Sequence, residues 1–180
     1  MTSKLELATL GGGCFWCLEA VFSQLKGIEI CESGYSGGSD PNPNYDKVCS
    51  GKTGHAEVVR LHFDPEVINF RKILAVFFAI HDPTTLNRQG NDIGTQYRSV
   101  IFYHSEEQRE AAEQFMQELV NRKIFNAPLV TELKPAEAYF PGETYHQQYF
   151  ENNPMQPYCA YVVAPKLEKA EDLFGDLFKR

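Results

Sequence analysis

The residues best suited to chemistry stand together near the start of the chain, in the sequence GGGCFWCL over residues 11–18. This stretch holds the only tryptophan of the chain, Trp16, and two of its five cysteines, Cys14 and Cys17. Apolar residues before it predict a short strand, and apolar residues after it recur at helical spacing. Cys14 is therefore expected at the N-terminus of a helix, after a turn that the three glycines allow.

A cysteine in that place is a candidate nucleophile. The unpaired backbone N–H groups and the positive end of the helix dipole favour an anion, so we expect the pKa of Cys14 to fall from about 8.5 toward neutrality. The alternative is that Cys14 is a small buried apolar residue, as most free cysteines are. Phe15 and Trp16 favour the nucleophile, because large aromatic side chains at a helix start have little reason to lie there unless they line a site.

The chain resembles the A-type peptide methionine sulfoxide reductases. The stretch GCFWC is similar to the signature of that family. Further stretches match it in order from about residue 5 to about residue 160: YSGG at 35–38, PNY at 43–45, GHAE at 54–57, DPT at 82–84, DIGTQYRS at 92–99 and YHQQY at 145–149. Several unusual motifs in one order are far more specific than a lone Cys-x-x-Cys.

The resemblance implies thiol-dependent reduction of methionine S-sulfoxide, in proteins or free, to methionine. It implies that Cys14 attacks the sulfur, that Glu57 supplies the proton, and that the hydroxyls of Tyr45 and Tyr97 stabilise the oxygen. Each residue has an ordinary alternative. Glutamate on a strand is usually a solvated edge residue, and most tyrosines are half-buried structural residues.

The same resemblance implies a place for the substrate. Phe15 and Trp16 would form an apolar, π-rich seat for the S-methyl group. Asp92 is either a turn residue, since it lies in the turn-like sequence NDIG, or a partner that orients the amide of the bound peptide. The family match supports the second role and leaves the first open.

The resolving thiol is the point at which this chain departs from the commonest family pattern. Many members have Gly at the position of Cys17 and carry the resolving cysteine in a flexible glycine-rich tail. Here Cys159 lies at the matching end, in a run without glycine. Residues three apart on a helix have Cβ atoms about 5–6 Å apart, and a disulfide needs about 3.5–4.5 Å. We therefore expect Cys17 to resolve the Cys14 sulfenic acid, with Cys159 as the second candidate or a relay thiol.

An external dithiol such as thioredoxin would then reset the enzyme, with neither a metal nor an organic cofactor. The rival hypothesis is a thioredoxin-like dithiol oxidoreductase, or a thiol-switch binding protein, that uses Cys14 and Cys17. Against it, Phe-Trp separates the two cysteines and no later cis-proline loop is evident. A zinc site needs four ligands from paired stretches, whereas Cys31, Cys49 and Cys159 are isolated.

Composition narrows the class of protein. A chain of 180 residues, 43% hydrophobic, suits one catalytic domain over residues 1–180. A net charge of −7 argues against nucleic-acid or anionic-membrane binding, and no apolar run approaches the length of a membrane span. The absence of a signal peptide and an odd number of cysteines predict a cytoplasmic, reduced protein. We expect a monomer.

The order of predicted elements indicates the fold class. Strands are expected over 5–10, 28–35, 57–63, 97–103, 129–133 and 159–163, and helices over 18–25, 70–80 with Asn69 as cap, 105–121 opened by a Ser105 and Gln108 capping box, 144–151 and 167–178. Polar stretches over 36–54 and 81–96 are expected as long loops. This order suggests an α+β fold, a two-layer split βαβ (ferredoxin-like) sandwich with a mixed sheet and long coil segments, which the resemblance also implies.

Overall fold

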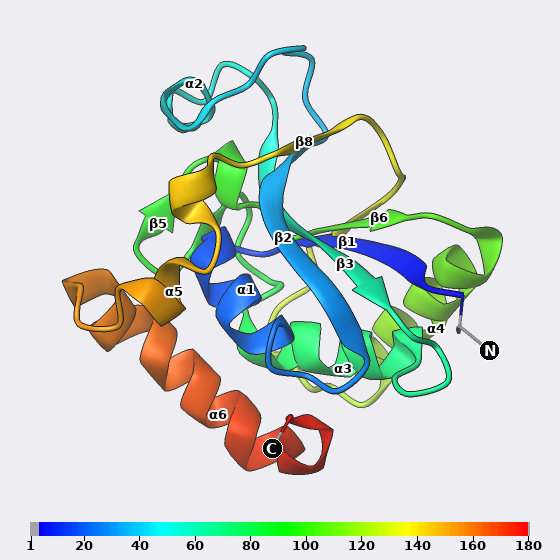
Figure 1. The fold of residues 1–180 in the computed structure, drawn as a ribbon. Helices are drawn as coiled ribbons and strands as arrows, with labels where there is room; N and C mark the ends of the chain where they lie inside the picture. Colours follow the sequence, from blue (N-terminus) through cyan, green and yellow to red (C-terminus); the bar gives the residue numbers. More distant parts are fainter. Residues whose placement is uncertain (1–3, 180) are drawn as a thin grey trace.

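The computed structural model describes residues 4–179 (Figure 1). The elements follow in the order β1 (Glu6–Gly11), α1 (Phe15–Phe22), β2 (Ile28–Ser36), α2 (Tyr45–Cys49), β3 (Ala56–Phe63), α3 (Phe70–Ile80), β4 (Arg88–Gln89), β5 (Asp92–Ile93), η1 (Thr95–Tyr97), β6 (Val100–Tyr103), α4 (Glu106–Asn121), β7 (Glu132–Pro135), β8 (Tyr139–Pro141), η2 (Thr144–His146), α5 (Tyr149–Asn152), η3 (Cys159–Val163), α6 (Ala164–Phe174) and η4 (Gly175–Leu177).

Six strands form one curled mixed sheet in the order β7-β6-β1-β3-β2-β8, so the fold is mixed α/β. Every neighbouring pair is antiparallel except β6 and β7, which run parallel. The two-residue strands β4 and β5 pair only with each other. In the part of the chain that the structure describes, none of the helices has the length and apolar character needed to cross a bilayer.

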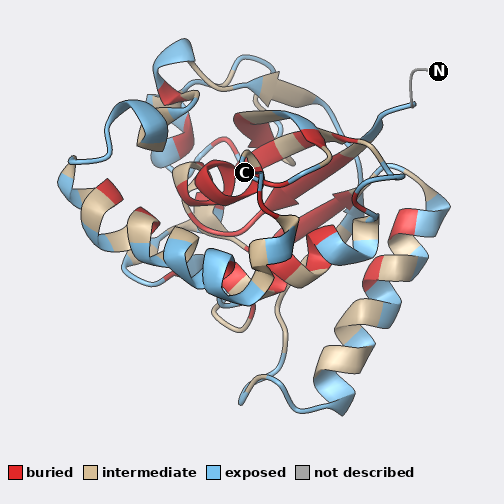
Figure 2. Ribbon diagram, turned by 60° about the horizontal axis from the view of Figure 1, so that its bottom comes forward, coloured by how far each residue is buried: buried red, intermediate tan, exposed pale blue. Residues whose placement is uncertain are grey.

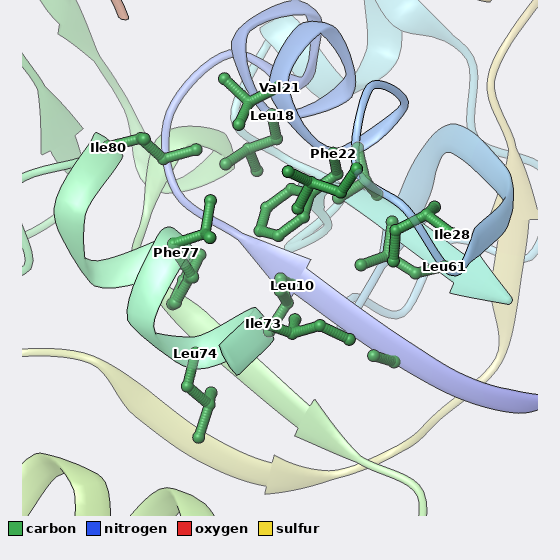
Figure 3. Close-up of a cluster of buried hydrophobic side chains, with 14 of the residues drawn as sticks. Leu10, Leu18, Val21, Phe22, Ile28, Leu61, Ile73, Leu74, Phe77 and Ile80 are labelled. Carbon is green, nitrogen blue, oxygen red and sulfur yellow. The ribbon is translucent and has the colours of Figure 1, made fainter. Parts of the chain in front are cut away.

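The core lies between one face of the sheet and the helices α1 and α3. Leu10 on β1 stands opposite Val59 on β3, and their neighbours along each strand alternate between the two faces. The apolar side of each helix packs on the strand residues that point the same way, as Figure 3 shows for Leu10, Leu18, Val21, Phe22, Ile28, Leu61, Ile73, Leu74, Phe77 and Ile80. Burial of a side chain of this size contributes about 1.5–3 kcal/mol. In Figure 2 buried residues accordingly gather on the sheet and on the inner sides of the helices.

The opposite face of the sheet is more polar. Thr9 bonds His104 there at 2.8 Å, and the Arg60 guanidinium lies 4.1 Å from the centre of the Tyr139 ring. The half-buried His62 lies on the same face, as the alternation of side chains along β3 requires. This face carries none of the residues predicted to do chemistry.

The structure confirms the two helix N-termini that capping residues predict. The Asn69 side chain accepts the Lys72 N–H at 2.8 Å, and α3 spans the predicted residues. The Ser105 side chain accepts the Gln108 N–H at 3.2 Å at the start of α4. The capping box is incomplete, because the Gln108 side chain accepts the N–H of His104 instead of that of Ser105.

The predicted strand over 159–163 is wrong. These residues form the π-helical turn η3, which runs directly into α6. Cys159 and Val163 are buried four residues apart and pack against Cys17 and Ala20 of α1. An apolar run of five residues fits either a strand or a helix, and the contact with α1 decides for the helix.

Other boundaries shift where a loop contains short elements. The expected loop over 36–54 includes the helix α2, and that over 81–96 includes β4, β5 and the start of η1. The strands β6 and β7 begin three residues later than predicted, and the expected helix over 144–151 divides into η2 and α5. Such short pieces depend on contacts distant in sequence, so periodicity does not reveal them.

A buried carboxylate joins α1 to the segment that follows η2. Glu19 is 3% exposed, and its Oε2 accepts the Ser33 hydroxyl of β2 at 3.1 Å. The backbone N–H groups of Gln148 and Tyr149, at the start of α5, also bond this carboxylate. Burial raises the pKa of Glu19 from 4.5 to about 7, although these hydrogen bonds favour its ionised form.

This predicts a stability difference that depends on pH. Because the folded pKa is raised, the contribution of Glu19 is full below its unfolded pKa near 4.3 and is lost as pH rises to about 7. The free energy of unfolding of Glu19→Gln, relative to that of the wild type, should therefore rise between pH 4 and pH 8 by an amount of order 1–3 kcal/mol. Urea unfolding at both pH values measures it, with the exposed Glu171→Gln as control. An equal difference at both pH values would contradict the raised pKa.

Candidate active site

Cys14 is the residue that begins α1, as the sequence predicts. It is the N-cap, with extended backbone at φ −66° and ψ 130°, and its carbonyl accepts the Cys17 N–H at 3.1 Å. The preceding Gly13 has φ +90°, and a Cβ there would stand 2.7 Å from the Gln89 side chain. The Gly13 N–H donates to the Tyr97 carbonyl at 3.2 Å, which holds the turn against η1.

The predicted lowering of the Cys14 pKa is wrong. Loss of contact with water and the nearby Glu57 carboxylate raise the pKa of the thiol well above its usual range, and Cys17 and Asp92 add to the effect. The Trp16 N–H acts in the opposite direction, as expected at a helix N-terminus, but is weaker. The helix start therefore positions Cys14 without ionising it.

Glu57 lies beneath the first turn of α1. It points from β3 to the same sheet face as Val59, is 1% exposed, and its Oε1 accepts the Phe15 N–H at 3.1 Å. Its Oε2 is buried and has no hydrogen-bond partner among residues 4–179. Burial raises the pKa of Glu57 from 4.5 to about 8, and the Asp92 charge adds to the rise. The solvated-edge alternative is wrong, and Glu57 holds a proton at neutral pH.

Tyr45 and Tyr97 are half-buried, in α2 and η1. Burial, together with the Glu57 charge, raises the pKa of both phenols, so both remain hydrogen-bond donors throughout the physiological range. Glu57 and Cys14 both influence the Tyr97 pKa, which places these three groups around one site. The structure thus links Tyr97 to both Cys14 and Glu57, whereas Tyr45 lies near Glu57 and Tyr97 and bonds the Cys49 thiol.

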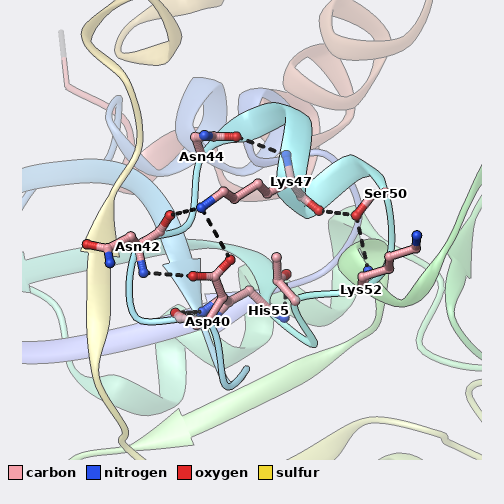
Figure 4. A network of polar contacts seen from close by, with 8 residues as sticks. Asp40, Asn42, Asn44, Lys47, Ser50, Lys52 and His55 are labelled. Carbon is pink, nitrogen blue, oxygen red and sulfur yellow. Dashed lines mark hydrogen bonds and ion pairs between the residues drawn. The ribbon is translucent and has the colours of Figure 1, made fainter.

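Two sets of polar contacts hold the loop that carries Tyr45. Glu143 accepts the Tyr45 N–H and the Tyr35 hydroxyl, each at 2.8 Å. In Figure 4 a second network crosses the loop, where Lys47 donates to the Asn42 carbonyl at 3.1 Å. This network also includes the Asn44 cap, Asp40, Ser50, Lys52 and His55. The loop is therefore tied to β2 and to the segment before η2.

Trp16 forms a half-buried aromatic wall beside Cys14. Its ring stacks on Tyr149 at a centroid distance of 3.8 Å and meets the edge of Tyr158 at 5.9 Å. Its indole N–H donates to His146 Nδ1 at 3.0 Å. Phe15, predicted with Trp16 as part of the seat, is fully buried against Tyr35 and His146. Phe15 supports the wall from behind and exposes no surface of its own.

Asp92 is both a turn residue and a site residue. It lies in β5, opposite Gln89, and its Oδ2 accepts the Tyr158 hydroxyl at 2.5 Å. That hydroxyl also lies 3.9 Å from Cys17 Sγ. Burial and the charges of the nearby thiols and Asp92 raise the pKa of Tyr158, so the phenol stays protonated and bridges the β4–β5 turn to the cysteines.

Sequence reasoning did not assign the residues that complete the site from the C-terminal side. These are Glu143, His146, Tyr149 and Tyr158. The signals available were the family motif YHQQY, which includes His146 and Tyr149, and the density of aromatic residues just after it. Their contacts lie more than 60 residues away along the chain, which no local pattern reveals.

The family model described as "Peptide methionine sulfoxide reductase" matches residues 6–176. The chain belongs to this family. The peptide methionine sulfoxide reductase MsrA of Polynucleobacter asymbioticus is 57% identical over 173 residues, which cover 96% of this chain and 91% of that protein.

Solved structures of a second relative, Mxr1 of Saccharomyces cerevisiae, also resemble this member of the family. The reduced form is 36% identical with a TM-score of 0.80, covering 85% of this chain and 88% of that one. An unusual oxidized form has a TM-score of 0.64 at 34% identity, covering 84% of each chain. Mxr1 in complex with Trx2 has a TM-score of 0.57 at 26% identity, covering 81% and 85%. This reductase therefore resembles reduced Mxr1 more closely than oxidized Mxr1.

All five cysteines of this reductase are free in the structure. Cys17 and Cys159 are buried in one small cluster, and the half-buried Cys14 packs against it. Burial raises the pKa of both Cys17 and Cys159. Among residues 4–179, no three His, Cys, Asp or Glu side chains gather as metal ligands.

The linked ionisation of Cys14 and Glu57 predicts an alkylation profile. Removing the Glu57 charge should lower the Cys14 pKa, so Glu57→Gln should react with iodoacetamide at a lower pH than the wild type does. Mass mapping of the Cys14 peptide between pH 6 and pH 10 gives the rate at this thiol alone. Glu19→Gln, another buried glutamate, should keep the wild-type profile; identical profiles in all three proteins would contradict the coupling.

Proposed function

We propose that this chain reduces methionine S-sulfoxide, in proteins and free, to methionine through a sulfenic acid on Cys14. The observation that supports this most directly is the pairing of Cys14 with a buried carboxylic acid. Glu57 bonds the first turn of the helix that Cys14 begins, and its second oxygen has no partner in the described chain. The pKa of Glu57, about 8, keeps it protonated at neutral pH. A proton donor beside a sulfur nucleophile is what sulfoxide reduction requires.

In the first step Glu57 donates its proton to the sulfoxide oxygen while Cys14 attacks the sulfoxide sulfur. The oxygen passes to the Cys14 sulfur, methionine leaves, and the thiol proton returns to Glu57. The balance is one thiol and one sulfoxide giving one sulfenic acid and one thioether, with Cys14 oxidised and the substrate reduced. The raised pKa values of Glu57 and Cys14 suit this exchange, because Glu57 keeps the proton that the oxygen needs and the Cys14 thiol keeps the proton that later returns to Glu57.

The remaining site residues have supporting roles in this proposal. The phenols of Tyr45 and Tyr97 donate hydrogen bonds to the sulfoxide oxygen as negative charge develops on it. The Trp16 ring receives the S-methyl group, with Phe15 behind it. Asp92, held by Tyr158, orients the substrate backbone amide.

The sulfenic acid then reacts with a thiol to give a disulfide and water. Cys17 is the first candidate because it lies one helical turn from Cys14. Cys159 packs against Cys17, which suits a second exchange that moves the disulfide to the C-terminal side. The complex of the relative Mxr1 with Trx2 supports a thioredoxin as the final reductant.

We also propose the finer features expected from the sequence. The central order β6-β1-β3-β2, with α1 and α3 as crossovers, supports a ferredoxin-like split βαβ unit. An odd number of cysteines scattered along the chain suits a reducing compartment such as the cytoplasm. We propose that the protein works as a monomer in one domain, which size-exclusion chromatography with light scattering tests.

A coupled assay tests the function. Purified protein, thioredoxin, thioredoxin reductase and the S epimer of a methyl sulfoxide should consume NADPH, whereas the R epimer should not. Cys14→Ser should abolish consumption, because a hydroxyl is too weak a nucleophile for the sulfoxide sulfur. Vigorous insulin reduction without consumption on either epimer would instead establish the dithiol oxidoreductase.

The resolving thiol is predicted by the helix geometry. After one turnover without reductant, wild-type protein should carry a Cys14–Cys17 disulfide, and Cys17→Ser should stop with sulfenic acid on Cys14. Cys159→Ser should still form the first disulfide but should be recycled more slowly by thioredoxin. Cys31→Ser serves as the control for loss of a thiol. A Cys14–Cys159 bridge in the wild type, with normal cycling of Cys17→Ser, would reverse the assignment.

A further inference from the structure

The Trp16 indole has one polar partner, and that partner is held in one protonation state. The indole Nε1 carries a hydrogen and is a donor only, so His146 Nδ1, 3.0 Å away, must accept with a free lone pair. The His146 ring is therefore neutral, with its proton on Nε2. Protonation at Nδ1 would place two N–H groups face to face and break the bond.

The surroundings of His146 favour this neutral state. The side chain is 1% exposed, and its Nε2 has no hydrogen-bond partner among the described residues. The rings of Phe15, Tyr45 and Tyr145 lie 5.1, 4.5 and 4.2 Å from the ring centre of His146. An imidazolium would thus have two buried N–H groups and no acceptor for either.

The charges around His146 are few. The Glu143 carboxylate favours a positive His146, whereas Tyr45 and Tyr145 are neutral phenols with raised pKa values, and Phe15 and Trp16 carry no charge. Glu143 is itself bonded by the Tyr35 hydroxyl and the Tyr45 N–H, which occupy its oxygens. Burial outweighs its charge, and the pKa of His146 lies below the ordinary 6.5.

We propose that His146 is a positioning residue that fixes the Trp16 ring in the orientation in which it lines the site. Stacking on Tyr149 sets the plane of the indole but is kept when the ring flips about its Cβ–Cγ bond, a rotation that exchanges the two edges of the ring. The hydrogen bond to His146 is directed along the indole N–H and removes this rotation. The two contacts together determine which edge of the ring faces Cys14. The consequence for substrate rests on the function proposed above.

The single tryptophan makes the wild-type protein its own probe. In the NMR spectrum of the 15N-labelled protein, the indole should give one N–H signal at the chemical shift of a hydrogen-bonded indole. This signal should shift in one step below pH 6.5 as His146 gains a proton. No substrate is present, so the result is independent of the reductase activity. A wild-type indole signal at the chemical shift of a free N–H in folded protein near pH 7 would overturn the proposal.

Two substitutions separate the acceptor from the packing. His146→Asn keeps an acceptor near the position of Nδ1, whereas His146→Phe keeps the ring and removes the acceptor. Only His146→Phe should move the indole signal to the field of a free N–H, and neither variant should show the titration. His62→Asn, on the opposite face of the sheet, should keep both the signal and its titration.

Kinetics on the S epimer test the consequence for substrate. His146→Phe should raise KM about tenfold with a smaller change in kcat, as expected for loss of one buried hydrogen bond, and His146→Asn should stay within about threefold of the wild type. In a Trp16→Phe background, which lacks the indole donor, His146→Phe should raise KM little further. Equal losses for both His146 variants, or a full tenfold effect in the Trp16→Phe background, would show that His146 acts only through packing.

Discussion

The hydrogen bond from the Phe15 N–H to Glu57 joins the first turn of α1 to the start of β3, and the arrangement of the site depends on it. It occupies one of the N–H groups that a helix start leaves unpaired, which is where an anion or a substrate would otherwise bind. It also draws the carboxyl group out of water and close to Cys14. One contact therefore sets both the position of the nucleophile and the protonation of its partner.

That protonation changes what the helix N-terminus does. A thiol at such a position is expected to ionise, yet here burial and the Glu57 carboxylate outweigh the helix dipole. Glu57 and Cys14 together hold protons that a sulfoxide needs and that a thiolate site would have lost. The arrangement is suited to an electrophile that must be protonated while it is attacked, which is the chemistry of a sulfoxide.

Residues from the C-terminal part of the chain form the other half of the site. Two carboxylates hold the segment that carries His146 and Tyr149. Glu19 of α1 accepts backbone N–H groups from within this segment, and Glu143, just before it, accepts the Tyr45 N–H of α2. Since both His146 and Tyr149 contact Trp16, this segment supports the aromatic wall that α1 alone does not hold. Cys159 follows on the same segment, packed against α1. The C-terminal part of the chain thus both supports the Trp16 ring and places a second thiol, Cys159, against α1.

Features that depend on neighbours in sequence were determined by the sequence itself. Cys14 at a helix start, the span of α3 after Asn69 and the start of α4 at Ser105 each follow from glycines, caps and periodicity within one or two turns. The family also followed from motifs that stand in order along the chain. Local hydrogen bonds and backbone propensities suffice for these, so no distant contact has to be known.

Only the tertiary structure decided the properties that depend on water and on distant partners. The direction of the Cys14 pKa shift depends on burial and on Glu57, 43 positions later in the chain, and the helical state of Cys159 depends on the packing of α1. The contact of Asp92 with Tyr158 and that of Trp16 with His146 join segments 66 and 130 residues apart. Burial and electrostatics act through space, and a pattern along the chain contains neither the solvent exposure of a group nor the identity of the group that faces it.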